Sequence, residues 1–275
     1  MHFRIFSVLS LAALLSIPAV ANNVFFFTTG NPDGQMATLS RVASTGKIQT
    51  ETADDFILNQ STTTLNQATF IGLIPTDALL SSISQVEIEF YHVFPKDSGP
   101  FDNRVTTRKN SPADVEIASA TRDSAAGTLS YAVTLLNPRF TAANSVVNGI
   151  NTFPNQFTGG EGPVTGQEVL ISVNFNTPVG LANGHYFFRP EALVNSGDFL
   201  WLSAPKAQFT GDLQTWMRND DLAPDWSRIG SDITGQGPFD ASFSLTGTSV
   251  PEPSTLALLG GGLSALAYLR RKFLA

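Results

Sequence analysis

Val86-Glu87-Ile88-Glu89-Phe90-Tyr91-His92-Val93-Phe94 is the stretch of sequence that decides the fold class. Apolar and polar side chains alternate in it with a period of two, so Phe90 and Phe94 share one face with His92. Glu87 and Glu89 point the other way. Such alternation is typical of an antiparallel strand with one buried face and one solvated face.

The same period recurs in other short stretches of the chain. Residues 129–135 and 169–175 alternate clearly, and weaker β-branched and aromatic runs lie between Gly, Pro, Asn and Asp clusters. Helix is expected only at 212–218 and, for a single turn, at 141–147. The pattern predicts an all-β fold with one domain, an antiparallel β-sandwich of jelly-roll type over residues 22–249. The weaker strand candidates are residues 24–29, 55–58, 69–73, 115–118, 186–189, 199–202 and 241–245.

Composition limits the classes of protein to which the chain can belong. Of its 275 residues, 42% are hydrophobic and 14% are charged, which supplies enough apolar material for a packed core. Without the two ends described below, 12 basic and 22 acidic residues remain, a net charge of −10. The longest basic run of this body is Arg108-Lys109, so we expect no nucleic-acid partner. Cysteine is absent, which excludes disulfides and a thiol nucleophile.

Residues 1–21 have the three parts of a secretory signal peptide. Arg4 supplies positive charge, an almost uninterrupted apolar run covers residues 5–17, and Ala19-Val20-Ala21 is a small-residue cleavage site. We expect the secretion machinery to recognise this segment and cleavage to follow Ala21. A retained anchor helix is the alternative, but the apolar run is short for a membrane span and Pro18 interrupts it.

Residues 250–275 form a second three-part signal at the other end. Pro251-Glu252-Pro253 is followed by apolar residues 254–269 and then by the basic cluster Arg270-Arg271-Lys272. At ~1.5 Å per residue the apolar segment makes roughly 24 Å of helix, slightly less than the ~30 Å of a bilayer core. We therefore expect a marginal transmembrane helix, with both basic ends in the cytoplasm and the body outside the inner membrane.

This tail closely resembles the PEP-CTERM sorting signal of exported bacterial proteins, because the Pro-Glu-Pro sequence, the apolar helix and the basic cluster occur in that order. The resemblance implies an exosortase as a partner, a membrane enzyme that cleaves near Pro-Glu-Pro, usually in Gram-negative bacteria that make extracellular polysaccharide. We expect an inner-membrane-tethered intermediate and then location at the cell surface or outside the cell. Residues 273–275 are a small departure, since such proteins often end at the basic cluster.

Glu87 and Glu89 are the obvious pair of carboxylates for catalysis. Their backbones lie about 6–7 Å apart on one strand, a separation that a glycosidase pair could use. They also alternate with apolar residues, as on an ordinary solvent-facing strand, and catalytic pairs usually come from different strands. Because no other catalytic motif occurs in the body, we expect a protein that is not an enzyme.

Several aspartates offer oxygen ligands of the kind that Ca²⁺ prefers. Asp54 and Asp55 are neighbours on a predicted strand and point to opposite faces, so we expect at most one of them at a given site. Turn and cap roles account for most of these carboxylates, and no known calcium loop is present. We expect no cofactor, with calcium as the open alternative. The candidate ligands are Asp54, Asp55, Asp220, Asp221 and Asp225.

The three tryptophans divide into one core candidate and two surface candidates. Trp201 lies in a stretch that is apolar on both strand faces, which predicts burial. Trp216 and Trp226 have polar neighbours in the sequence and are the better candidates for a ligand-binding surface, because exposed aromatic rings stack on the faces of sugars.

Two targeting signals around a body without a catalytic motif favour an exported cell-surface or matrix protein of structural or adhesive type. A carbohydrate-binding module is the alternative, with Trp216 and Trp226 on its surface and calcium as a supporting ion. Its partner would be extracellular polysaccharide. A polysaccharide hydrolase is the third hypothesis, and it requires carboxylates that converge from separate strands.

Overall fold

The computed structural model describes residues 23–94, 109–150, 156–205 and 214–250, together with Gly262. The predicted signal peptide and, apart from Gly262, the predicted transmembrane helix lie outside these residues. Within the described part of the chain, no helix has both the length and the apolar character that a membrane crossing requires.

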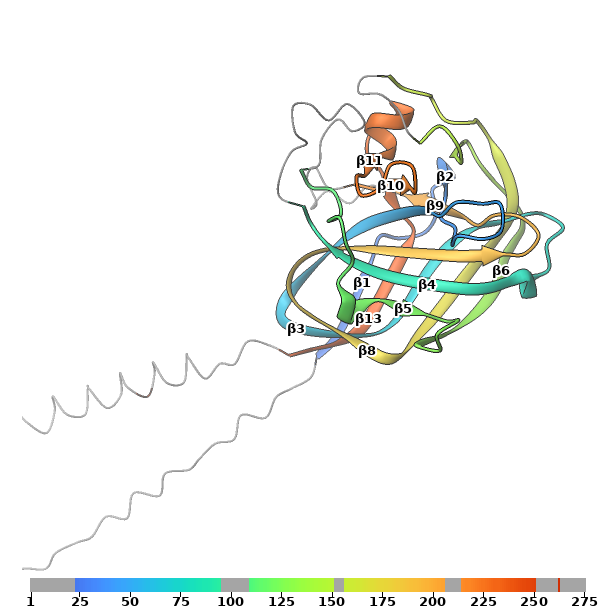
Figure 1. The fold of residues 1–275 in the computed structure, drawn as a ribbon. Coiled ribbons are helices and arrows are strands. Elements are labelled where there is room, and N and C mark those ends of the chain that lie inside the picture. Colours follow the sequence, from blue (N-terminus) through green and yellow to red (C-terminus); the bar gives the residue numbers. More distant parts are fainter. Residues whose placement is uncertain (1–22, 95–108, 151–155, 206–213, 251–261, 263–275) are drawn as a thin grey trace, which may run out of the picture.

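Strands dominate the described chain (Figure 1). The helical elements are two single turns of 3₁₀-helix, η1 (Leu80–Ser82) and η2 (Ala118–Ala120), and the π-helix η3 (Ile229–Thr234). The prediction of an all-β fold with little helix is confirmed. In chain order the strands are β1 (Asn23–Thr28), β2 (Met36–Leu39), β3 (Thr50–Ile74), β4 (Ile83–His92), β5 (Arg122–Asp123), β6 (Leu129–Ala142), β7 (Asn144–Val146), β8 (Val164–Val194), β9 (Leu200–Ala204), β10 (Trp216–Asn219), β11 (Ser227–Arg228), β12 (Asp240–Ala241) and β13 (Phe243–Val250).

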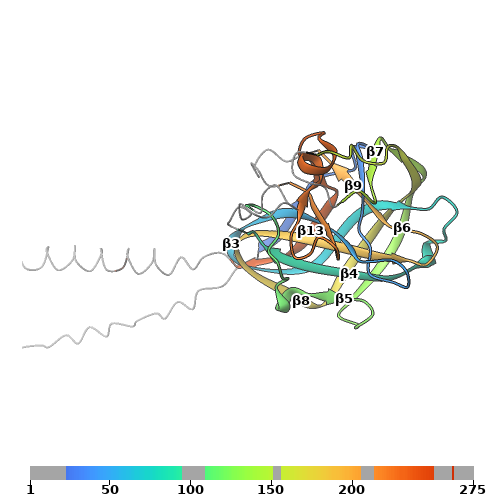
Figure 2. The ribbon, with the colours of Figure 1, turned by 45° about the horizontal axis from the view of Figure 1, so that its top comes forward.

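Two long antiparallel strands, β3 and β8, connect the whole sheet. Residues 62–74 of β3 pair with residues 167–182 of β8, and residues 54–58 of β3 pair with residues 184–188 of β8. Between these segments the register shifts, as at a β-bulge, and bulges increase the local bend and twist of a strand. Both strands curve through the molecule and meet two different groups of neighbours (Figures 1 and 2).

The two groups of neighbours define two halves of one sheet. The β1 half contains β6, the first part of β8, the second part of β3, β13 and β1, in that order. The β4 half contains β5, β4, the second part of β8, the first part of β3, β10 and β11. β9 pairs with β2, β3 and β12, and β2 pairs in parallel with β7. All 13 strands form one continuous sheet, so the two-sheet jelly roll stays a prediction.

Aromatic side chains from both halves pack into one core. Phe56, Phe90 and Phe188 come from the β4 half, Phe70 and Phe243 come from the β1 half, and none is more than 2% exposed. The rings of Phe188 and Phe243 stack with their centroids 5.0 Å apart. Burial of this shared apolar surface holds the two halves against each other.

Most of the predicted strands are present, often as parts of longer strands. The predicted strands 55–58 and 69–73 both belong to β3, and 169–175 and 186–189 both belong to β8. The prediction for residues 115–118 is wrong, because this segment forms no strand and ends in the first residue of η2. A β-branched run forms a strand only where a neighbouring strand is available to pair with it.

Both helix predictions are wrong where the structure describes the residues. Within 212–218, strand β10 begins at Trp216 and pairs with residues 50–53 of β3. Within 141–147, the chain finishes β6 and forms β7, which pairs in parallel with residues 36–38 of β2. Ladder hydrogen bonds and burial in the tertiary structure outweigh a weak local preference for helix.

Candidate functional site

A buried network of charges lies on the face of the β4 half that points away from the core. Its centre is the guanidinium of Arg189 on β8, which is 1% exposed. Nη1 lies 2.6 Å from Oε2 of Glu191, and Nε lies 3.2 Å from Oε1 of Glu51. Nη2 lies 3.2 Å from Oε1 of Glu87 and also contacts Glu89. Four carboxylates from β3, β4 and β8 therefore surround one arginine.

Arg218 and Tyr91 extend this network to β10. Arg218 contacts Glu51 through Nε, and its Nη2 donates to the Tyr91 hydroxyl at 3.1 Å. That hydroxyl donates to Oε2 of Glu89 at 2.5 Å. Cζ of Arg218 lies 4.3 Å from the centroid of the Trp226 ring, within cation–π distance. Charge-assisted hydrogen bonds thus fasten β10 to the outer face of the sheet.

The excess of carboxylates over arginines decides which groups are ionised. Burial raises the pKa of Glu191 to about 8, because the charge of Arg189 does not offset desolvation and neighbouring carboxylates add repulsion. Burial also raises the pKa of Glu87. Burial opposes ionisation of Glu89 as well, but the charge of Arg189 and the Tyr91 hydroxyl outweigh it and lower the pKa of that carboxyl. Glu191 therefore keeps a proton at neutral pH while Glu89 is ionised.

The interpretation of Glu87 and Glu89 as an ordinary solvent-facing pair is therefore wrong. Their side chains are 16% and 11% exposed, and both contact Arg189, which is 102 residues from Glu87 in sequence. Local alternation reports only that the two carboxylates share a face. It does not reveal that Arg189 lies between these carboxylates, or that Arg218 of β10 packs beside them.

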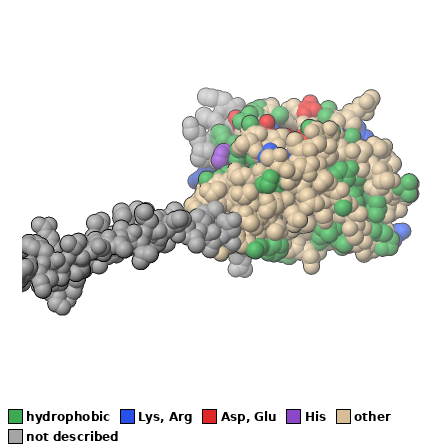
Figure 3. All heavy atoms as spheres, turned by 90° about the horizontal axis from the view of Figure 1, so that it is seen from below, with side chains coloured by type: hydrophobic (Ala, Val, Ile, Leu, Met, Phe, Trp, Pro, Cys, Tyr) green, Lys and Arg blue, Asp and Glu red, His purple; other side chains and the backbone are tan. Residues whose placement is uncertain are grey.

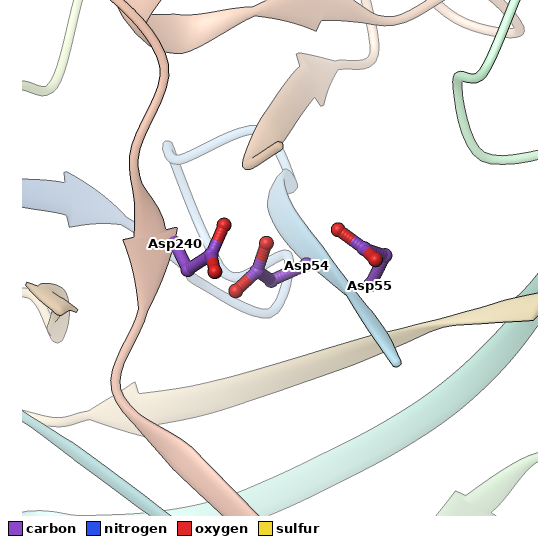
Figure 4. Close-up of side chains that lie close together, drawn as sticks. All are labelled: Asp54, Asp55 and Asp240. Carbon is purple, nitrogen blue, oxygen red and sulfur yellow. The ribbon is translucent and has the colours of Figure 1, made fainter. Parts of the chain in front are cut away.

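A second acidic cluster consists of Asp54, Asp55 and Asp240, each of which brings a carboxylate oxygen within 4.8 Å of the other two. All three residues are at most 2% exposed. Figure 4 shows Asp54 and Asp240 turned toward each other on one side of β3, with Asp55 on the other side. The prediction that only one of Asp54 and Asp55 reaches such a cluster is wrong, although their side chains do leave opposite faces of the strand.

Burial and mutual repulsion oppose full ionisation of this cluster. Oδ2 of Asp54 accepts the Ala241 N–H at 2.7 Å, and Oδ1 accepts the Thr215 hydroxyl at 3.4 Å. Burial, and then the charges of Asp240 and Asp55, raise the pKa of Asp54 well above its ordinary value. Ca²⁺ takes six to eight oxygen ligands, and three carboxylates that each bind through one oxygen supply part of such a set. Calcium binding stays a prediction.

The remaining candidate calcium ligands lie apart from this cluster. Asp220 and Asp221 are exposed beyond the end of β10, whereas Asp225 is 3% exposed. Asp220 accepts the Gln49 N–H at 3.3 Å, a contact between segments 171 residues apart and not the expected local turn role. Within the described ranges, these three aspartates form no group with metal-ligand spacing.

Trp216 and Trp226 are buried, so the prediction that they form a binding surface is wrong. Both are 0% exposed and lie in an apolar cluster with Tyr91 and Phe187. Trp216 begins β10, and Trp226, in the connection from β10 to β11, packs on the Tyr91 ring and the Arg218 guanidinium, so both are buried whatever the polarity of their sequence neighbours. Trp201 is 0% exposed in the main core, as predicted.

The two ends of the body lie side by side at one edge of the sheet. β1 and β13 pair antiparallel, with Asn23 opposite Ser249 (Figure 1). The predicted signal cleavage site and the Pro-Glu-Pro sequence each begin two residues beyond this pair. The residues predicted to act in cleavage and sorting lie outside the described ranges: Ala19, Ala21, Pro251, Glu252, Pro253, Arg270, Arg271 and Lys272.

Comparison with known proteins bears mainly on the C-terminal tail. Residues 249–272 match a protein family described as the PEP-CTERM protein-sorting motif. No curated protein matches the chain. Among solved structures, the chain is similar to the cysteine protease and lectin-like domains of Cwp84, a surface layer associated protein of Clostridium difficile, at 9% identity and a TM-score of 0.33. The similarity covers 74% of this chain and 33% of that chain, so this chain spans about a third of its length.

The match includes the Pro-Glu-Pro sequence and the basic cluster, and it confirms the resemblance inferred from them. It begins inside β13, the last strand of the body, at the residue that pairs with Asn23. The chain therefore ends in a PEP-CTERM protein-sorting motif, the signal of an exosortase substrate, at residues 249–272.

Proposed function

We propose that the chain is an exported protein of the cell surface or extracellular matrix, with a structural or adhesive role, whose body is delivered by exosortase processing of its tail. The sorting motif at residues 249–272 is the observation that carries this proposal. Its position directly after β13 supports it, because cleavage near Pro251 would leave every strand of the body intact.

The pairing of β1 with β13 supports a tethered intermediate. Asn23 and Ser249 are register partners, so a signal segment before Asn23 and a tail after Val250 start from the same edge of the body. A precursor that has both segments in the inner membrane can hold a fully folded body outside that membrane. No strand would have to open for the secretion machinery or the exosortase to reach its cleavage site.

The charge network supports a non-enzymatic body. Arg189 and Arg218 occupy oxygens of Glu51, Glu87 and Glu89, which a hydrolase would need to keep available for a substrate and a water molecule. Such a network stabilises the position of β10 on the sheet. We therefore place polysaccharide hydrolysis behind the structural and the binding hypotheses.

Cell fractionation combined with intact-mass measurement tests the proposal. An epitope tag inserted after Ala126, in the exposed turn before β6, would be followed in strains with and without an exosortase. We expect the signal to be absent from the protein in both strains and the tail to be absent only when the exosortase is present. Without the exosortase, the tailed form should stay in the membrane fraction. Alanines at Pro251-Glu252-Pro253 should reproduce the second result, and Phe273→Ala should not. Cytosolic protein with Met1 and Ala275 intact would contradict the proposal.

A further inference from the structure

The outer face of the β1 half is made mostly of uncharged side chains, many of them with hydroxyl groups, and Glu168 of β8 lies on the same side at the end of this face. Residues on the inner face are buried in the core, and the alternate residues point outward and are half-buried or exposed. We call these outward residues the hydroxyl face. They are Ser130, Ala132 and Thr134 of β6, Leu170, Ser172 and Asn174 of β8, Thr64, Gln67, Thr69 and Ile71 of β3, Ser244, Thr246 and Thr248 of β13, and Val24, Phe26 and Thr28 of β1.

The strand register places these side chains in straight rows across the sheet. In one row, Ser172, Thr69, Ser244 and Thr28 are successive register partners on β8, β3, β13 and β1. Neighbouring strands are ~4.8 Å apart, so hydroxyl groups repeat across the face at roughly that interval. This spacing is comparable with the length of one sugar ring.

A groove of about 310 Å³ lies within the hydroxyl face. Thr28, Thr69 and Ser244 contribute hydroxyl groups to its lining. Phe26 of β1 contributes to the wall on one side and Leu136 of β6 to the wall on the other. These two apolar side chains are 64% and 46% exposed, and large exposed apolar side chains beside a hollow are a feature of ligand sites.

The Thr69 and Ser244 hydroxyl groups have unused hydrogen-bonding capacity, whereas the Thr28 hydroxyl already donates to the Phe243 carbonyl and accepts the Gly30 N–H. Oγ1 of Thr69 and Oγ of Ser244 lie 2.6 Å apart and share one hydrogen bond. Two hydroxyls carry two protons, so one donor and several acceptor positions of this pair are available to a ligand. In the next row, Gln67 donates to Asn174 at 2.9 Å and keeps its second amide proton.

Charge decides between classes of ligand. The residues that line the groove include no Lys, Arg, Asp or Glu, and the charged residue nearest in register on β8 is Glu168, two residues before Leu170. The body has a net charge of −10. Figure 3 likewise shows a broad surface of uncharged side chains and backbone, with charged side chains mainly near its borders. An anionic polymer would meet repulsion from the acidic body without a compensating cation in the groove. A neutral polyhydroxyl chain meets hydroxyl partners and an aromatic ring on which an apolar sugar face can stack.

We propose that this groove binds a neutral polysaccharide, with Phe26 as the stacking platform and Thr69 and Ser244 as hydrogen-bonding partners. The inference deepens the proposed function, because only an exported body meets extracellular polymer. It replaces Trp216 and Trp226 as the sugar-binding residues. Binding is measured on the isolated protein, so its failure would leave the sorting of the chain untouched, and a failure of sorting would leave the binding result untouched.

Affinity electrophoresis of the full chain tests the proposal, in a zwitterionic detergent that has no sugar headgroup. The probes are hydroxyethyl cellulose and dextran as neutral polymers and alginate as an anionic polymer. We expect at least one neutral polymer to retard the wild type and alginate not to do so. Phe26→Ser and the double variant Thr69→Val, Ser244→Ala should each raise the dissociation constant about tenfold, as expected for the loss of a stacking contact or a hydrogen-bonded pair.

Leu79→Ser is the matched control, since Leu79 is 74% exposed but lies before η1, away from the groove. It should bind as the wild type does. Melting temperatures within a few degrees of the wild type would show that each variant is folded. The two groove variants remove different interactions, an aromatic stacking contact and a pair of hydrogen-bonding groups, so each tests the groove independently. Absence of retardation by both neutral polymers would overturn the proposal, as would unchanged binding by both groove variants. The tail-cleaved protein is also mixed with phosphatidylcholine/phosphatidylglycerol vesicles in a flotation assay. If it binds no polymer but floats with the vesicles, and flotation requires Phe26, the hydroxyl face is a lipid-binding surface instead.

Discussion

Replacement of Glu191 by Gln tests whether the buried network holds a proton. Glu191 is 0% exposed, and its Oε2 accepts a hydrogen bond from Gln49 at 2.9 Å and lies 2.6 Å from Nη1 of Arg189. Its Oε1 has no hydrogen-bond partner within the described residues. Glutamine keeps the shape and the accepting oxygen but cannot ionise. If Glu191 is already neutral in the folded protein, the replacement changes little at acidic and neutral pH.

The magnitude follows from proton linkage. Burial raises the pKa of Glu191 from 4.5 to about 8 in the folded state. Between these values the folded protein retains a proton that the unfolded chain has released, so the free energy of unfolding falls as pH rises. One group in this state contributes roughly 1.4 kcal/mol per pH unit. From pH 5 to pH 8 the wild type should therefore lose on the order of 3–4 kcal/mol that Glu191→Gln does not lose.

Urea unfolding followed by tryptophan fluorescence measures this difference, because all three tryptophans are buried in the folded state. We expect Glu191→Gln to be close to the wild type near pH 5 and to be the more stable protein at pH 8. Glu116→Gln is the control, since Glu116 is exposed and should leave the pH dependence unchanged. Parallel curves for the wild type and Glu191→Gln from pH 5 to pH 8 would refute the assignment of the proton to Glu191.

Three further substitutions test the core and the aspartate cluster. Trp226→Ala should lower the free energy of unfolding by about 3–5 kcal/mol and leave polymer binding by the folded fraction unchanged, which calorimetry and affinity electrophoresis would measure. Gly72→Ala should destabilise by about 1–3 kcal/mol or more in urea unfolding, because a Cβ there would lie 2.3 Å from the Phe199 ring and 2.5 Å from the Leu200 carbonyl oxygen. Asp54→Asn should reduce the loss of stability as pH rises above about 4, because the wild-type carboxyl retains its proton in the folded state. A Ca²⁺-dependent rise in melting temperature that Asp54→Asn abolishes would instead favour calcium in the cluster.

Parts of the candidate sites were readable in the sequence, and parts were not. Glu87 and Glu89 stand out by their spacing, and Asp54 and Asp55 by their adjacency. Arg189 was missed, although a charged residue directly after three aromatic or apolar strand residues is itself a signal of a buried ion pair. Asp240, Glu51 and Arg218 carry no comparable local signal, because each reaches its cluster through strand pairing over a long sequence separation.

The groove could not be predicted from the sequence either. Threonine and serine are common on the solvated faces of strands, and their presence alone predicts only exposure. A binding surface arises because β8, β3, β13 and β1 align Ser172, Thr69, Ser244 and Thr28 in one row. Register between strands that are distant in sequence depends on the whole sheet.

The sequence by itself determined the all-β class of the fold and the sorting motif at residues 249–272. A period of two, regular turn residues and short terminal signals are local patterns, so each can be recognised without knowledge of its neighbours. Only the tertiary structure decided that Trp216 and Trp226 are buried, that four glutamates share Arg189, and that β1 and β13, the first and last strands of the body, pair at one edge. These outcomes depend on which strands pair and which face is covered, and both are set by the burial of one shared core between the two halves of the sheet.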